Sequence, residues 1–173
     1  MKLYLSSYRI PTPEDLSSLI GKDLSKVKVV TIANAKDYLA DLARSVKITE
    51  TLNYLGTIVL NNIDEVDLRQ YRNPSELKSK LSDYDFIWVM GGNTFCLRHA
   101  MKQSGFDEII KKVLESGIVY GGESAGACVA GNSLKGIELA DNPLFSESVI
   151  WDGLKLIDKY ILPHADNVVF AEA

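Results

Sequence analysis

The sequence predicts an α/β fold, with a mainly parallel sheet that is covered by helices on both faces. Two observations lead to this prediction. Short apolar runs rich in β-branched or aromatic residues recur along the chain, and helical patterns lie between them. The chain has 173 residues, enough for one domain with a sizeable core, so we expect a single domain over residues 1–173.

The apolar runs predict strands that are buried on both faces, because such strands do not need a polar residue at every second position. The N-terminal stretch "MKLYLSSYRI" is expected to hold the first strand, and "KYILPHA" a late one. The other expected strands are 28–33 ("KVVTIA"), 57–60 ("TIVL"), 85–90 ("DFIWVM") and 118–120 ("IVY").

Helices are expected in the segments between these runs. Apolar residues at helical spacing predict helices over 38–55 and over 106–114, the second with Gly117 as its C-terminal stop. "NPSELKSKL" places Pro74 where a helix begins. Asn93 is a suitable N-cap for a further helix over 93–103.

Composition and charge exclude several classes of protein. Hydrophobic residues make up 46% of the chain and charged residues 24%, which is typical of a globular protein. A net charge of −4 argues against a nucleic-acid partner, and no apolar run approaches the roughly 20 residues of a membrane span. Cys96 and Cys128 lack the spacing of a metal site. We therefore expect a cytoplasmic protein without metal or cofactor.

The stretch "GGESAGA" fits the pattern G-x-S-x-G of a nucleophile elbow. Ser124 would lie between the strand at 118–120 and a helix that begins at Ala125. In such an elbow a strained turn projects the hydroxyl above the sheet, and small neighbours let the main chain pass close to itself. A tight strand-to-helix turn that serves packing alone is the alternative explanation.

The stretch "MGGNTF" leaves the carboxyl end of the strand at 85–90. If that strand lies beside the one before Ser124, the Gly91 or Gly92 amide could face the same point as the Ala125 amide. Two such donors would form an oxyanion hole, next to the N-cap Asn93. A glycine-rich turn with a helix cap is the alternative explanation here.

His164 is the favoured general base, because it follows the serine in the chain and lies near the end of the expected late strand. His99 is the other candidate, but it falls inside a predicted helix. Asp141 is the candidate for the acid that orients the histidine, although an aspartate before Asn-Pro also commonly caps a loop. Other carboxylates within range by sequence are Asp158, Asp166 and Glu172.

The ordered set "MGGNTF", "GGESAGA", "ADNP" and "LPHAD" resembles the peptidase E family of serine peptidases, family S51, which includes aspartyl dipeptidases and cyanophycinases. The resemblance spans most of the chain, from the N-terminal strand to His164. It implies an α/β sandwich related to class I glutamine amidotransferases, with serine at the elbow where those enzymes carry cysteine. By resemblance Ser124 matches the nucleophile and His164 the base, while Gly91 and Gly92 match the oxyanion loop and Ala125 gives the other amide.

The resemblance implies two different acids. Asp141 stands where an aspartate has been assigned in aspartyl dipeptidases, whereas another assignment uses a glutamate well downstream of the histidine. This chain ends nine residues after His164, and family domains usually run further, so a short-form or truncated member is expected.

The sequence thus predicts a serine peptidase that cleaves short peptides, dipeptides among them, through an acyl-enzyme. Its partner would be a small peptide substrate, and the sequence predicts no oligomeric state. The alternative is a catalytically impaired short-form member that acts as a binding or remnant protein. Amidotransferase-like or redox chemistry is disfavoured, because it needs a thiol at the position of Ser124.

Overall fold

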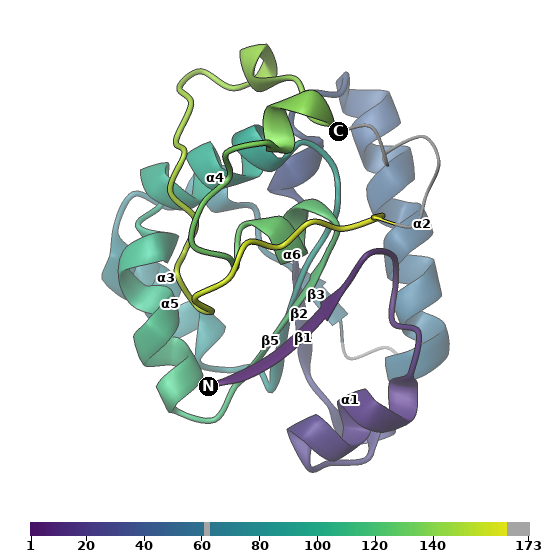
Figure 1. Ribbon diagram of the computed structural model, residues 1–173. Coiled ribbons are helices and arrows are strands. Elements are labelled where there is room, and N and C mark those ends of the chain that lie inside the picture. Colours follow the sequence, from purple (N-terminus) through teal and green to yellow (C-terminus); the bar gives the residue numbers. More distant parts are fainter. Residues whose placement is uncertain (61–62, 166–173) are drawn as a thin grey trace.

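The structure, a computed structural model, describes residues 1–60 and 63–165. In this part of the chain the strands form one five-stranded sheet, in the order β1-β5-β4-β2-β3, and every neighbouring pair is parallel (Figure 1). The strands are β1 (Lys2–Ser6), β2 (Val29–Ile32), β3 (Ile63–Glu65), β4 (Phe86–Val89) and β5 (Val119–Glu123). The predicted α/β class with a parallel sheet is confirmed.

Helices cover both faces of the sheet. One side carries α1 (Pro13–Ile20) and α2 (Asp41–Val59), and the other carries α3 (Pro74–Leu81), α4 (Thr94–Gln103) and α5 (Phe106–Glu115) (Figure 1). The four-residue α6 (Ala125–Cys128) follows β5 directly. Short 3-10 turns lie at Leu24–Lys26, Asn34–Lys36, Leu68–Gln70, Ile137–Leu139 and Pro143–Phe145. None of the helices in the described ranges is long and apolar enough to cross a membrane.

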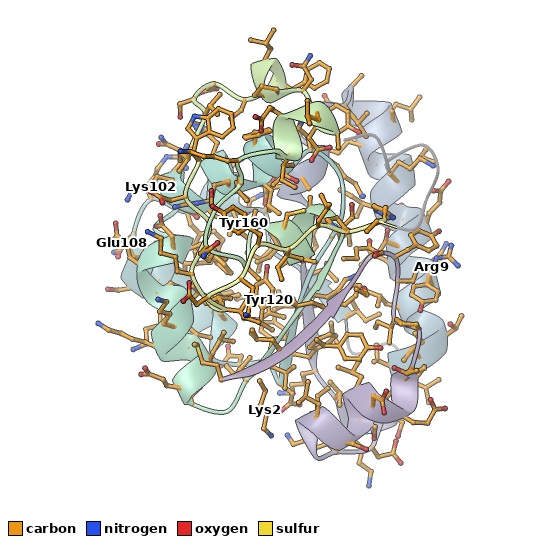
Figure 2. The ribbon with its side chains drawn as sticks, viewed as in Figure 1. Lys2, Arg9, Lys102, Glu108, Tyr120 and Tyr160 are labelled. Carbon is orange, nitrogen blue, oxygen red and sulfur yellow. The ribbon has the colours of Figure 1, made fainter. Side chains whose placement is uncertain are left out.

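The central strands are buried on both faces, which explains their unbroken apolar sequences. In β4, Phe86 and Trp88 point into the core beneath α1 and α2, whereas Ile87 and Val89 point into the core beneath α3, α4 and α5. All four side chains are fully buried. Tyr120 of β5 lies in the interior of the molecule (Figure 2). Period-two alternation therefore divides apolar residues between two cores instead of dividing apolar from polar residues.

The predicted strand over 57–60 is wrong, because α2 continues through Val59 and ends where Leu60 adopts φ +47°. Leu55 and Val59 lie one helical turn apart and are both fully buried, so the helical period extends into the β-branched run. The third strand is β3 instead. It is short, lies at the sheet edge and carries acidic residues, so it lacks the apolar run that marked the other strands.

The predicted strand in "KYILPHA" is also wrong, because residues 159–165 form irregular turns. Tyr160 and Leu162 are 66% and 53% exposed, which contrasts with the buried side chains of the central strands. The segment is held instead by single contacts, such as the hydrogen bond of 3.0 Å from the main-chain N–H of Asn132 to the Lys159 carbonyl. The helix α1 was not predicted from the sequence.

The turn between β5 and α6 brings two stretches of main chain into close contact. A Cβ atom added to Gly122 would overlap the carbonyl of Gly126 and lie 2.8 Å from the Ala127 nitrogen. A Cβ atom added to Gly126 would overlap the carbonyl of Val89 in β4. Both glycines are therefore required by the close approach of the helix to the sheet.

We expect Gly122→Ala to destabilise the protein by about 1–3 kcal/mol, because rigid main-chain atoms must move to admit the methyl group. The matched control is Gly56→Ala in the middle of α2, where a Cβ atom meets nothing within 4 Å. That change should stabilise the protein by about 0.5–1 kcal/mol through helix propensity. Denaturant unfolding of both variants measures the difference, and equal stabilities would contradict the packing described here.

Candidate active site

Ser124 occupies the turn between β5 and α6 in a strained conformation, with φ +49° and ψ −111°. Its amide donates to the Ser6 carbonyl at 3.0 Å, and its own carbonyl accepts from the amides of Ala127 and Cys128 at 2.9 Å. These hydrogen bonds hold the main chain on both sides of the turn. A non-glycine residue in this region persists only where the surrounding structure imposes it.

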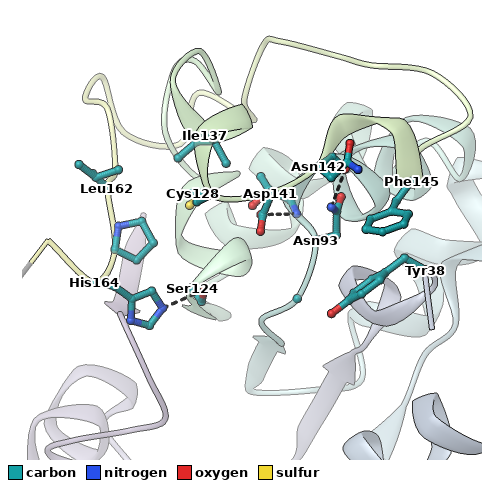
Figure 3. Close-up of a pocket in the computed structure, with 14 residues that line it drawn as sticks. Tyr38, Asn93, Ser124, Cys128, Ile137, Asp141, Asn142, Phe145, Leu162 and His164 are labelled. Atoms are coloured by element: carbon teal, nitrogen blue, oxygen red, sulfur yellow. Dashed lines mark hydrogen bonds between the residues drawn. The ribbon is translucent and has the colours of Figure 1, made fainter. Parts of the chain in front are cut away.

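His164 lies against Ser124, with its Nε2 atom 3.1 Å from the serine Oγ (Figure 3). The histidine has φ +59°, and its amide donates to Ser7 Oγ at 3.1 Å, just beyond β1. The structure thus brings together the two residues that the sequence singled out, although His164 belongs to a turn and not to a strand end. His99 is elsewhere, with Nδ1 2.8 Å from Ser148 Oγ in a different pocket.

The glycines after β4 lie beside the elbow, because β4 and β5 are neighbours in the sheet. The Gly91 amide points at Glu123 Oε1, 3.4 Å away, so it is directed away from the serine hydroxyl. Gly92, with φ +147°, lines the same pocket as Ser124. Within the described residues the amides of Gly92 and Ala125 have no acceptor. These two are the amides available to an oxyanion.

Asn93 has a structural position in the site. Its Oδ1 accepts from the amides of Phe95 and Cys96 at 3.1 and 3.0 Å, which caps α4 as the sequence predicted. Its Nδ2 donates to the Asn142 carbonyl at 2.9 Å and so ties the start of α4 to the loop that carries Asp141. The Asn93 side chain therefore connects the start of α4 with the 141–142 loop, and both segments line the pocket.

Asp141 lies in the pocket wall, and its Oδ2 accepts from the Thr94 amide at 2.8 Å (Figure 3). Burial raises the pKa of the Asp141 carboxyl, while its hydrogen bonds with Thr94 and the charge of His164 oppose this rise. Its hydrogen bond to Thr94 is thus a capping contact, and its orienting role stays a prediction. Asp158 accepts from Asn132 Nδ2 at 3.0 Å, and Asp166 and Glu172 lie outside the described residues.

The pocket has a volume of about 380 Å³. Ser124 and His164 lie at one end, and Tyr38 and Phe145 stack at the other with ring centroids 5.2 Å apart (Figure 3). Cys128 also lines it, but burial raises the pKa of its thiol to about 12. The thiol is therefore protonated near neutral pH and is a poor nucleophile.

Several residues at the site were not predicted from the sequence. Thr94, Asn142 and Tyr38 line the pocket, and Lys36 and Glu123 bind the loop at Gly91. Of these residues, only Glu123 could have been identified from the sequence, because it is a charged residue at the end of an apolar strand. The others depend on contacts between distant segments.

Comparisons with known proteins show which family of proteins the chain is similar to. The model of peptidase family S51 matches residues 16–172. The chain is 38% identical to the uncharacterized peptidase Lin0382 of Listeria innocua, over 89% of this chain and 69% of that protein. It is 30% identical to the uncharacterized peptidase Lmo0363 of Listeria monocytogenes, over 90% of this chain and 72% of that protein.

A peptidase E of Shewanella sp. is 33% identical over 66% of this chain and 48% of that protein. A crystal structure from Listeria monocytogenes EGD-e, provisionally assigned to peptidase E, superposes with a TM-score of 0.80 at 29% identity, over 99% of this chain and 83% of that one. The chain therefore belongs to peptidase family S51 and is a peptidase.

Proposed function

We propose that this peptidase is of the serine type and hydrolyses short peptides through an acyl-enzyme on Ser124. The observation that carries the proposal is the 3.1 Å distance between Ser124 Oγ and His164 Nε2, at a turn whose strain exposes the hydroxyl. This distance lies within the reach of a general base.

In the proposed reaction His164 Nε2 takes the proton of Ser124 as Oγ attacks the carbonyl carbon of the scissile bond. The carbonyl oxygen gains the negative charge and accepts hydrogen bonds from the Gly92 and Ala125 amides. The tetrahedral intermediate then expels the amine, which leaves with the proton from His164. Water attacks the ester in the same way and restores the free serine.

Asp141 supports the charge that His164 acquires. The pKa of the carboxyl is raised by burial and is lowered again by His164, so the two groups interact electrostatically. A carboxylate at this position attracts the positive charge that the imidazole gains during the proposed reaction. Asp141 therefore acts as an electrostatic partner of the base and also caps the start of α4.

The pocket suits a small substrate. Its volume of about 380 Å³ is near the lower end of the range for ligand pockets, roughly 300–1,000 Å³. This space accommodates about two residues of a peptide, with Tyr38 and Phe145 offering apolar contact at the end opposite Ser124. The free, buried thiols of Cys96 and Cys128 suit a reducing compartment such as the cytoplasm.

A fluorophosphonate probe should label the wild-type protein at Ser124, and Ser124→Ala should abolish the labelling. The reason is that only a deprotonated hydroxyl beside free amides attacks the phosphorus at a useful rate. Intact-mass and peptide mass spectrometry measure the adduct. Ser116→Ala, at the C-terminal end of α5 and outside the pocket, is the control that labels normally. A folded wild-type protein that neither labels nor hydrolyses dipeptides would support the non-catalytic alternative instead.

Asp141→Asn should lower the labelling rate and the hydrolysis of dipeptides at least about tenfold, because the imidazolium loses its nearby anion. The fold should survive at neutral pH. Asparagine keeps an acceptor for the Thr94 amide, and it removes the cost of burying a charged carboxyl, the cost that raises the pKa of Asp141 on folding. Asp158→Asn, in a loop outside the pocket, is the control, and an Asp141→Asn rate within twofold of wild type would exclude the electrostatic role.

A further inference from the structure

The Gly91–Gly92 peptide bond needs an external support to keep its orientation. Its N–H belongs to Gly92, a donor that the proposed function assigns to the oxyanion, and its C=O belongs to Gly91. Glycine on both sides leaves the main-chain torsions free of the usual steric limits, and Gly92 has φ +147°. Rotation of this peptide unit would turn the donor out of the pocket.

Lys36 provides such a support. It lies in the 3-10 turn after β2, and its Nζ atom donates to the Gly91 carbonyl at 2.6 Å. The half-buried ammonium does not face the substrate pocket. It lines a separate small cavity of about 170 Å³ together with Arg9 and Glu123. The Gly91 carbonyl therefore faces this cavity through Lys36, whereas Gly92 lines the substrate pocket.

We propose that Lys36 is a positioning residue of the oxyanion hole, which acts by holding the Gly91 carbonyl. In a planar trans peptide the C=O and the following N–H point in opposite directions. A carbonyl fixed on the Lys36 side therefore aims the Gly92 N–H at the Ser124 side. The positive charge of the Lys36 ammonium beside the carbonyl oxygen also polarises the peptide and strengthens its N–H as a donor. This inference rests on the proposed serine mechanism.

The surroundings of Lys36 fit this role. The buried carboxylate of Glu123 holds the same loop, with Oε1 3.4 Å from the Gly91 amide and Oε2 2.7 Å from the Arg9 amide. Burial lowers the pKa of the Lys36 ammonium, whereas the negative charge of Glu123 raises it. The neighbouring Ala35 carbonyl accepts from the Asn93 amide at 2.7 Å. Ala35 and Lys36, which follow β2, thus bind the loop after β4 at Asn93 and at Gly91.

The test compares the fluorophosphonate reaction of wild type, Lys36→Met and Lys36→Arg. Methionine keeps most of the aliphatic stem and removes the ammonium, so kinact should fall about 10- to 100-fold, less than the roughly 10²- to 10³-fold cost of losing a donor outright. KI should stay within about threefold, because the donor acts on charge that develops in the transition state. Lys36→Arg, which keeps a cation, should recover part of the rate.

Lys47→Met is the matched control. Lys47 lines the same small cavity but pairs with Glu50 at 2.9 Å, so its kinact should equal that of wild type. A Lys36→Met protein that melts like wild type and keeps its kinact would overturn the role of Lys36 and leave the serine mechanism intact. A variant in which KI is weakened and kinact is unchanged would do the same. A folded wild type that never labels would overturn the serine mechanism and this inference with it.

Discussion

The site depends on one constraint, the contact between the main chain of β5 and the start of α6. Gly122 and Gly126 allow this contact, and it forces Ser124 into a backbone conformation that an L-residue otherwise avoids. The same turn sets the direction of the hydroxyl and of the Ala125 amide. The Ser124 hydroxyl and the Ala125 amide are therefore positioned together by main-chain packing.

The order of the strands supplies the remaining groups. Because β4 lies between β5 and β2, the loops that follow these three parallel strands meet at one edge of the sheet. The loop after β4 contributes Gly92, the turn after β2 contributes Lys36, and the turn after β5 contributes Ser124. Residues that are far apart in the sequence thus become neighbours, and the chemistry is carried by turns on a rigid sheet.

Local patterns in the sequence predicted much of this arrangement. The buried strands, the Asn93 cap and the small residues at the elbow each follow from a few consecutive residues. The run at 57–60 could not be assigned in this way, since β-branched residues suit both a strand and the buried side of α2. Contacts such as Thr94 with Asp141, or Lys36 with Gly91, join segments 47 and 55 residues apart and follow only from the tertiary structure.

Hydrogen bonds at the end of β1 and just beyond it affect the order in which the site folds. The carbonyl of Ser6 binds the Ser124 amide, and Ser7 Oγ binds the amide of His164, 157 residues later in the chain. Contacts between such distant segments form late, because closing a long loop costs entropy before any contact compensates for it. In a chain that is still being synthesised, Ser124 therefore has no imidazole beside it until the segment that carries His164 has been made and has packed against Ser7. Under the proposed mechanism, peptidase activity would begin only at that point.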